Sequence, residues 1–260
     1  MRLIRSRLAI LIAAGVIAIA LLGWALAGAG RPKPVLGLFT TLPIYWAEAA
    51  DMSEMISGGG HPGWVRGALE KRFELLPLDT LAPPERGAAR DLGDIDILLL
   101  AQPRALSPQE NVALDEWVRA GGHVLVFADP MLTAHSRFAI GDRRRPQDVA
   151  LLSPILARWG LEMRFDPEQE GGERLITTDL APLPVHLAGT LHPIDGYPTR
   201  TENCWIAYDR LFAQCAIGDG EATIVADAAV FEEAEGERRK MRADALEWLT
   251  ASAFGDGTRR

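Results

Sequence analysis

The chain has 260 residues, of which 48% are hydrophobic and 24% charged, and its formal net charge is −8. This composition is typical of a globular protein and excludes an intrinsically disordered or fibrous one. All 35 acidic residues lie beyond the first thirty positions, so the body of the chain repels phosphate backbones and nucleic acid is not an expected partner. Two cysteines are too few for a disulfide scaffold or a cysteine-based structural zinc site.

An uncharged apolar run occupies residues 8–30. In a helix that rises about 1.5 Å per residue, such a run spans the roughly 30 Å hydrocarbon layer, so it predicts an N-terminal membrane anchor at residues 1–30. A cleavable signal peptide is the alternative, since Ala25-Leu26-Ala27 resembles a cleavage site. Three arginines precede the run, at positions 2, 5 and 7, and place the N-terminus in the cytoplasm. We therefore expect a single-pass inner-membrane protein with a periplasmic or otherwise extracytoplasmic C-terminal domain.

A linker at residues 31–34 leads into one expected α/β domain at 35–254, and residues 255–260 form a tail. Apolar runs of strand length alternate with helical patterns. The runs lie at residues 35–39, 73–78, 95–101, 123–128, 161–165 and 222–226. Amphipathic helical patterns lie at residues 64–73, 153–159 and 242–251. Residues 166–220 are richer in proline and glycine and predict a β-rich excursion with hairpins. The alternation indicates right-handed crossovers and an open twisted sheet.

One further helix has a clear start and stop signal. Ser107-Pro108-Gln109-Glu110 has the form of a capping box, in which Ser107 accepts from the Glu110 amide and Glu110 reaches back. Pro108 occupies the first helical position, where its missing N–H costs nothing. Gly121-Gly122 ends the helix.

Motifs of catalysis and cofactor binding are not found in the sequence. It has no G-x-x-x-x-G-K-[ST], no G-x-S-x-G and no H-E-x-x-H, and its glycine-rich stretch at 57–60 lacks dinucleotide-binding spacing. The acidic and basic run at 232–239 is typical of a solvated face. The sequence thus predicts a protein that is not an enzyme and has no cofactor and no metal.

Polar and aromatic residues follow several predicted strands. In open α/β sheets, ligands collect beyond the carboxyl ends of the strands. The residues that we expect there to bind a ligand or partner are Tyr45, Trp46, Gln102, Asp129 and Asp227. The alternative for the two aspartates is that they only cap turns and following helices.

Cys204 and Cys215 flank a segment that reads as strand, turn and strand. Such a hairpin brings both ends opposite each other, so we expect a disulfide between them if the chain is exported. Two buried free thiols are the alternative, because the register of a hairpin is not determined by its sequence.

Residues 97–130, ILLLAQPRALSPQENVALDEWVRAGGHVLVFADP, resemble the signature of the ABC-type uncharacterised transport system family. This family includes the accessory subunit of gliding-motility-associated ABC transporters. The resemblance continues in residues 151–163, 220–231 and 245–250. It implies a fold like class I glutamine amidotransferases without their active site. The fold class expected is therefore an N-terminal transmembrane helix followed by an open, mostly parallel flavodoxin/amidotransferase-like sheet with helices on both faces.

The resemblance also implies work with separate ABC components. We expect a membrane-tethered, non-enzymatic accessory or binding component, with the membrane and separately encoded ABC permease and ATPase subunits as its partners. The alternative is an extracytoplasmic hydrolase or transferase that uses Asp129 and Asp227 in a metal-assisted carboxylate site.

Overall fold

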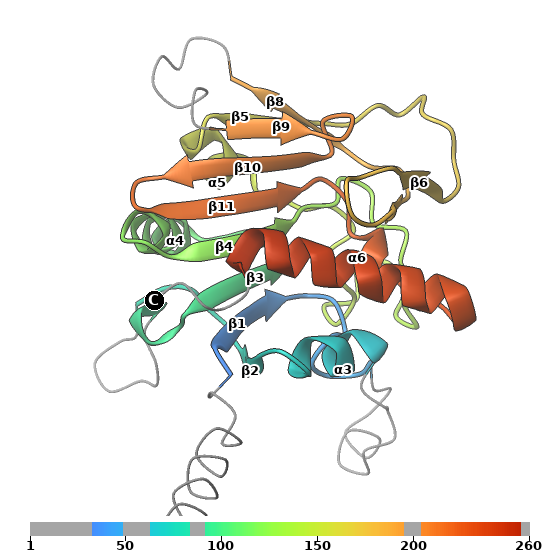
Figure 1. Cartoon of the computed structure of the whole chain (residues 1–260), viewed down its shortest axis with the longest axis horizontal. Coiled ribbons are helices and arrows are strands. Elements are labelled where there is room, and N and C mark those ends of the chain that lie inside the picture. Colours follow the sequence, from blue (N-terminus) through green and yellow to red (C-terminus); the bar gives the residue numbers. More distant parts are fainter. Residues whose placement is uncertain (1–32, 49–62, 84–91, 195–203, 256–260) are drawn as a thin grey trace, which may run out of the picture. The chain divides into compact units, whose positions relative to one another are not determined.

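A seven-stranded sheet forms the centre of the protein in the computed structural model, which describes residues 33–48, 63–83, 92–194 and 204–255 (Figure 1). Its strand order is β2-β1-β3-β4-β11-β10-β9. Five strands are mutually parallel: β1 (Val35–Thr40), β2 (Glu74–Pro77), β3 (Ile97–Ala101), β4 (His123–Phe127) and β11 (Gly220–Val225). β10 (Phe212–Ile217) runs antiparallel to both β11 and β9 (Cys204–Ala207).

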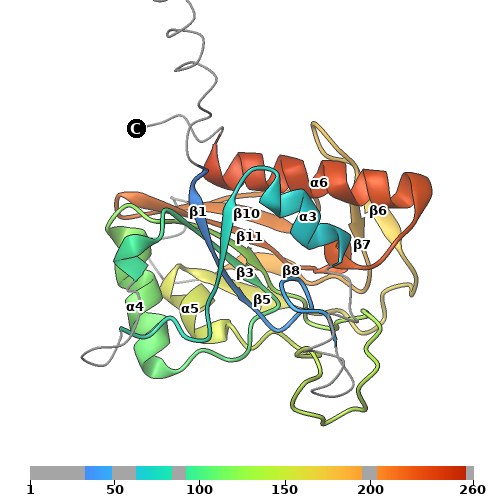
Figure 2. The same cartoon turned by 90° about the horizontal axis from the view of Figure 1, so that it is seen from below.

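Four helices from the described part of the chain cover the sheet. Figure 2 shows α3 (Trp64–Glu70) and α6 (Gly236–Phe254) on one face and α4 (Pro108–Arg119) and α5 (Ser153–Arg158) on the other. With both faces covered, β3 in the middle of the sheet is apolar throughout, and each of its residues is buried. Short 3₁₀ turns, η1 (Leu92–Asp94) and η3 (Ala229–Phe231), precede β3 and follow β11.

Two small antiparallel sheets stand beside the main one. β5 (Leu161–Arg164) pairs with β8 (Thr190–Pro193), and β6 (Arg174–Ile176) pairs with β7 (Leu183–Val185). The β-rich excursion expected at residues 166–220 contains the β6–β7 pair, β8, and the last two strands at one edge of the main sheet, β10 and β9.

The expected fold class is wrong as stated. The fold is mixed α/β, and the main sheet contains an antiparallel β9–β10–β11 segment where an open, mostly parallel flavodoxin/amidotransferase-like sheet was expected. The physical reason is the short connection: only Gly218 and Asp219 separate β10 from β11, and a two-residue turn can join only antiparallel strands.

The expected membrane placement is also corrected. Within the described residues, the structure contains no helix whose length and apolar character would let it cross a membrane. The single-pass inner-membrane protein with a transmembrane helix is therefore not supported by the described residues. The apolar run on which it rested, at residues 8–30, lies outside the described residues.

The β10–β11 turn packs closely against the C-terminal end of α4. Gly218 has a φ of +63°, and a Cβ there would meet the Arg119 carbonyl oxygen at 2.6 Å. A Cβ on Gly220 would lie 2.0 Å from the Val118 carbonyl oxygen. Only glycine allows the backbone to approach this closely, so these two positions fix how the hairpin docks on the helix.

A disulfide joins Cys204 on β9 to Cys215 on β10. The two residues are direct partners in the antiparallel register, with their Cα atoms 4.0 Å apart. The bond holds the edge strand β9 to the rest of the sheet.

The capping box at the start of α4 is confirmed, and it belongs to a larger network. The buried Glu110 carboxylate accepts hydrogen bonds from Ser107 N–H at 2.8 Å, Leu81 N–H at 3.2 Å and the Thr80 hydroxyl at 2.8 Å. Arg104 donates two more, at 2.7 and 2.8 Å. Although burial opposes ionisation, these bonds hold the pKa of Glu110 well below its ordinary value. Glu110 thus ties the loop after β2 to the start of α4.

We expect Glu110→Ala to lower the free energy of unfolding by about 3 kcal/mol, because it leaves a buried Leu81 N–H and the Arg104 charge without their acceptor. Urea unfolding of the full chain measures this loss. Glu116→Ala on the exposed side of the same helix is the matched control and should stay within about 0.5 kcal/mol of wild type. Equal effects of the two substitutions would contradict a special role for Glu110.

Reduction of the Cys204–Cys215 disulfide should lower the free energy of unfolding by about 3 kcal/mol, since the bond closes a short loop in the unfolded chain. The measurement is urea unfolding with and without a thiol reductant. A Cys204→Ala/Cys215→Ala double variant should show no response to the reductant. An unchanged unfolding midpoint after both thiols have been freed would refute this expectation.

Candidate functional site

The carboxyl ends of the five parallel strands meet at one edge of the main sheet, to the right in Figure 1. The predicted site residues all follow these strands: Tyr45 and Trp46 after β1, Gln102 after β3, Asp129 after β4 and Asp227 after β11. The structure nevertheless divides them into two groups. Tyr45 and Trp46 line a pocket, whereas the other three are at most 2% exposed.

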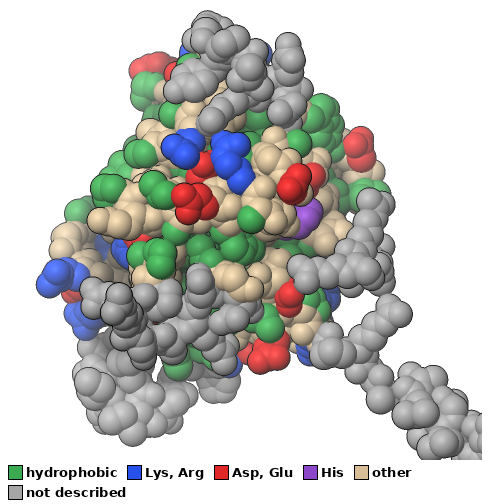
Figure 3. Space-filling model, turned by 90° about the vertical axis from the view of Figure 1, so that its left-hand side faces the viewer, with side chains coloured by type: hydrophobic (Ala, Val, Ile, Leu, Met, Phe, Trp, Pro, Cys, Tyr) green, Lys and Arg blue, Asp and Glu red, His purple; other side chains and the backbone are tan. Residues whose placement is uncertain are grey.

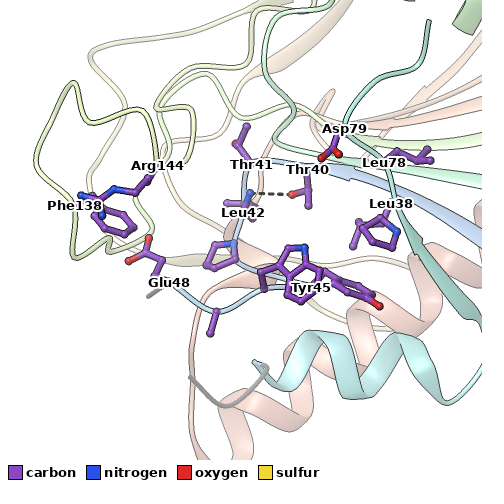
Figure 4. A pocket seen from close by; sticks show the side chains of 14 residues that line it. Leu38, Thr40, Thr41, Leu42, Tyr45, Glu48, Leu78, Asp79, Phe138 and Arg144 are labelled. Carbon is purple, nitrogen blue, oxygen red and sulfur yellow. Dashed lines mark hydrogen bonds between the residues drawn. The ribbon is translucent and has the colours of Figure 1, made fainter. Parts of the chain in front are cut away.

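The pocket lies beyond β1 and β2 and has a volume of about 280 Å³ (Figure 4). Most of its lining is apolar or aromatic. Three of its side chains are charged, namely Glu48, Asp79 and Arg144. Figure 4 shows Asp79 beside Thr40 on one side and Glu48, Phe138 and Arg144 on the other.

The aromatic floor of the pocket is formed by neighbours in the sequence. The Tyr45 and Trp46 rings meet edge to face with centroids 4.8 Å apart. The Arg66 guanidinium covers Tyr45 at 4.2 Å from the ring centroid and donates to the Tyr45 carbonyl at 3.0 Å. Trp46 is 68% exposed. A large aromatic side chain held by its neighbour and open to solvent is typical of a binding surface.

The far wall comes from the loop between β4 and α5. The Arg144 guanidinium lies over the Phe138 ring at 4.2 Å and pairs with Asp142 at 2.7 Å. Glu48 holds this loop against the segment after β1, because its carboxylate accepts from the Ser136 hydroxyl at 2.7 Å and the Arg137 N–H at 2.9 Å.

Gln102 is a structural link between strand ends. Its side-chain oxygen accepts from Asp129 N–H at 2.9 Å, and its nitrogen donates to the carbonyls of Asp129 at 3.1 Å and Gln147 at 2.8 Å. Its φ of +45° is a left-handed conformation that costs a residue other than glycine about 1–2 kcal/mol. The three hydrogen bonds offset this cost.

Asp129 and Asp227 bind backbone amides with every carboxylate oxygen. Asp129 accepts from the N–H groups of Met131 at 2.8 Å and Ala228 at 3.2 Å. Asp227 accepts from those of Ala229 at 2.6 Å and His186 at 2.8 Å. The two aspartates therefore fasten the ends of β4, β7 and β11 together, as the turn-capping alternative requires.

Burial and neighbouring negative charges disfavour the ionised form of both aspartates. Burial raises the pKa of Asp129 from 3.8 to about 6, and the charge of Glu232 adds to the effect. Burial, followed by the charge of Asp129, raises the pKa of Asp227 well above its ordinary value. Two carboxylates that repel each other in a buried site favour the protonated form of one of them.

The acidic run at residues 232–239 is only partly a solvated face. Glu232 accepts from the Thr133 hydroxyl at 2.7 Å and from Arg242 at 3.3 Å. Arg242 is fully buried, and it also donates to the Ala229 carbonyl at 3.1 Å and to Glu173. This ion-pair network joins α6 to the strand ends. Sequence analysis missed it because the contacts join residues far apart in the chain.

Some pocket residues also escaped prediction. Asp79 follows the predicted second strand, so its position at a strand end could have identified it. Phe138 and Arg144 lie in a long loop without a periodic signal, and only the fold brings them to β1. No group of three histidine, cysteine, aspartate or glutamate side chains suited to a metal ion occurs within the described ranges.

The opposite edge, towards which the amino ends of the parallel strands point, has a different character. Figure 3 shows this side, where acidic and basic side chains lie next to one another. A surface on which charges of both signs are interspersed is typical of a face exposed to water.

A family model described as ABC-type uncharacterized transport system matches residues 33–169. A comparison with curated proteins gives no match. Among solved structures, 93% of the chain aligns with 38% of an exo-β-1,4-mannosidase from Opitutaceae bacterium strain TAV5, at 14% identity and a TM-score of 0.43. A β-galactosidase from Rahnella sp. R3 aligns at 12% identity and a TM-score of 0.45, over 85% of this chain and 31% of its own.

A cytoplasmic protein from Salmonella typhimurium aligns at 11% identity and a TM-score of 0.45, over 84% of this chain and 98% of its own. The chain spans less than half the length of either glycosidase. The finer resemblance, to the fold of class I glutamine amidotransferases, is not supported.

We expect the Asp129–Asp227 pair to make the protein about 1 kcal/mol more stable at pH 5 than at pH 8. With the pKa of Asp129 raised from 3.8 to about 6, the folded chain holds a proton that the unfolded chain has lost, so the stabilisation disappears as the pH rises through 6. Urea unfolding at both pH values measures the change. Asp129→Asn should reduce this difference, although burial still favours the protonated form of Asp227; an identical pH dependence in wild type and variant would contradict the assignment.

Proposed function

Since this chain belongs to the family described as ABC-type uncharacterized transport system, we propose that it is a non-enzymatic accessory component that binds a ligand or partner at the pocket beside β1. The exposed Trp46 ring, held edge to face on Tyr45, is the observation that carries the binding role. Such aromatic pairs give a large rigid contact area at low entropic cost.

The buried strand-end residues act in this proposal as supports. Gln102 fixes the relative position of the β3 and β4 ends, and it also holds Gln147 in the loop that carries Phe138 and Arg144. The Gln147 N–H in turn donates to the Thr41 hydroxyl at 3.0 Å. The buried residues therefore hold the pocket wall in position.

The hydrolase or transferase alternative has less support. A general acid, a general base or a metal ligand needs a carboxylate oxygen with spare capacity that a substrate or ion can reach. Asp129 and Asp227 are 1% and 2% exposed, and all their oxygens already accept backbone N–H groups. These contacts favour a structural role for both residues.

Permease and ATPase subunits encoded as separate chains are the partners that the family suggests. A photo-crosslinking amino acid placed at Trp46 in the full chain, in its native cells, should capture such a subunit. Trp205 is the matched control, because it is also an exposed tryptophan, 53% accessible, but lies on β9 at the other end of the strand order. Crosslinks of equal yield from both positions, or capture of no transport subunit from Trp46, would overturn the proposal.

A further inference from the structure

We propose that the pocket beside β1 takes a small organic cation of the alkylammonium class. This inference rests on the proposed function, which assigns binding to the same pocket, and it adds the chemical class of the ligand. The ligand class depends on which polar groups of the pocket lining have hydrogen-bonding capacity left for a ligand.

Most of the polar lining is already engaged by the protein. The Thr40 hydroxyl donates to the Ala101 carbonyl at 2.6 Å and accepts from Leu42 N–H at 2.9 Å, the bond dashed in Figure 4. The Thr41 hydroxyl donates to the Gln102 carbonyl at 2.5 Å. Both threonines therefore contribute mainly methyl groups to the pocket.

Two of the three charged lining residues are engaged as well. Glu48 accepts from Ser136 and from the Arg137 backbone, and Arg144 pairs with Asp142 while it lies over Phe138. A guanidinium that is paired with a carboxylate and stacked on a ring is a poor site for an anionic ligand, because an anion would have to displace Asp142.

Asp79 is the third charged residue, and its state is different. It is exposed, and its carboxylate accepts no hydrogen bond from a described residue. The charge of Asp79 acts on Arg104, but the Arg104 guanidinium is bound by Glu110, and its remaining hydrogen bonds go to the carbonyls of Asp79 and Ala105. The pocket therefore presents a carboxylate whose acceptor capacity the described residues leave unused.

The aromatic floor suits the same kind of ligand. A cation within about 6 Å of an aromatic ring is attracted by the negative face of the ring. Two neighbouring rings already carry a protein cation in this way, Arg66 over Tyr45 and Arg144 over Phe138. The exposed Trp46 ring carries no such cation from the described residues. A ligand ammonium between Asp79 and Trp46 would gain both an ion pair and a cation–π contact.

Volume restricts the ligand further. About 280 Å³ lies at the lower limit for small-molecule pockets, so a compact cation fits better than a segment of folded protein. The apolar lining, which includes Leu38, Leu42 and Leu78, suits the alkyl groups of such an ion.

Choline and its uncharged isostere 3,3-dimethylbutan-1-ol, which differ chiefly in the positive charge, are the probes. Titration calorimetry on the full chain should show saturable choline binding, with the alcohol at least about tenfold weaker. Because the attraction is electrostatic, choline affinity should fall as NaCl is raised from 0.01 to about 0.1 M, where the screening length shortens from about 30 to 10 Å.

Asp79→Asn and Trp46→Ala should each weaken choline binding about tenfold. Glu116→Gln removes one exposed negative charge on α4, away from the pocket lining, and should leave choline affinity within about twofold of wild type, since long-range effects are screened. Thermal unfolding of each variant establishes that it is folded. The salt series on the wild type tests the same electrostatics without a substitution.

Three results would overturn the inference: no choline binding, equal binding of choline and the alcohol, or unchanged affinity in Asp79→Asn. None of these touches the proposed function if a crosslinker at Trp46 still captures a transport subunit. Loss of that capture with choline binding intact would instead leave the cation site standing and refute the partner role.

Discussion

The Gln102 side chain is the contact on which the carboxyl edge of the sheet depends. A parallel sheet leaves its strand ends side by side, but nothing in the ladder fixes the loops that leave them. Gln102 uses both ends of its amide to join Asp129 and Gln147 to the end of β3. Because the donor and acceptor of one amide are rigidly placed, three loop segments are set in position by a single side chain. The left-handed backbone of Gln102 is the local cost of this arrangement.

Around this link, buried carboxylates replace the backbone acceptors that the strand ends lack. Asp129, Asp227 and Glu110 together accept amide hydrogens from loops that have no ladder partner. Buried N–H groups need acceptors, so these residues are constrained by the fold. Glu110 remains ionised because Arg104 compensates its charge, whereas burial and mutual repulsion favour the protonated form of one of the two aspartates.

The same edge thus has an inner and an outer part with different tasks. Its inner residues bind backbone groups and are closed to solvent, whereas its outer residues include the half-buried Tyr45 and the exposed Trp46. Rigid support beneath an exposed aromatic surface reduces the entropy lost when a ligand is ordered on it. This division favours recognition over bond-making chemistry, in agreement with membership of an accessory transport family.

Local signals in the sequence determined much of this protein. The capping box at Ser107 and Glu110, the apolar runs of β3 and β4 and the strand-end positions of Tyr45, Gln102 and Asp129 could all be read from neighbours in the chain, because hydrogen bonds and periodicity act over a few residues. Only the tertiary structure decided which strand-end residues are open to solvent. It also decided that β11 pairs with β4, which brings β10 and β9 into the main sheet, and that Phe138 reaches the pocket beyond β1, since these contacts link positions dozens of residues apart. Burial and pairing over such distances depend on how all the elements pack, which no short stretch of sequence encodes.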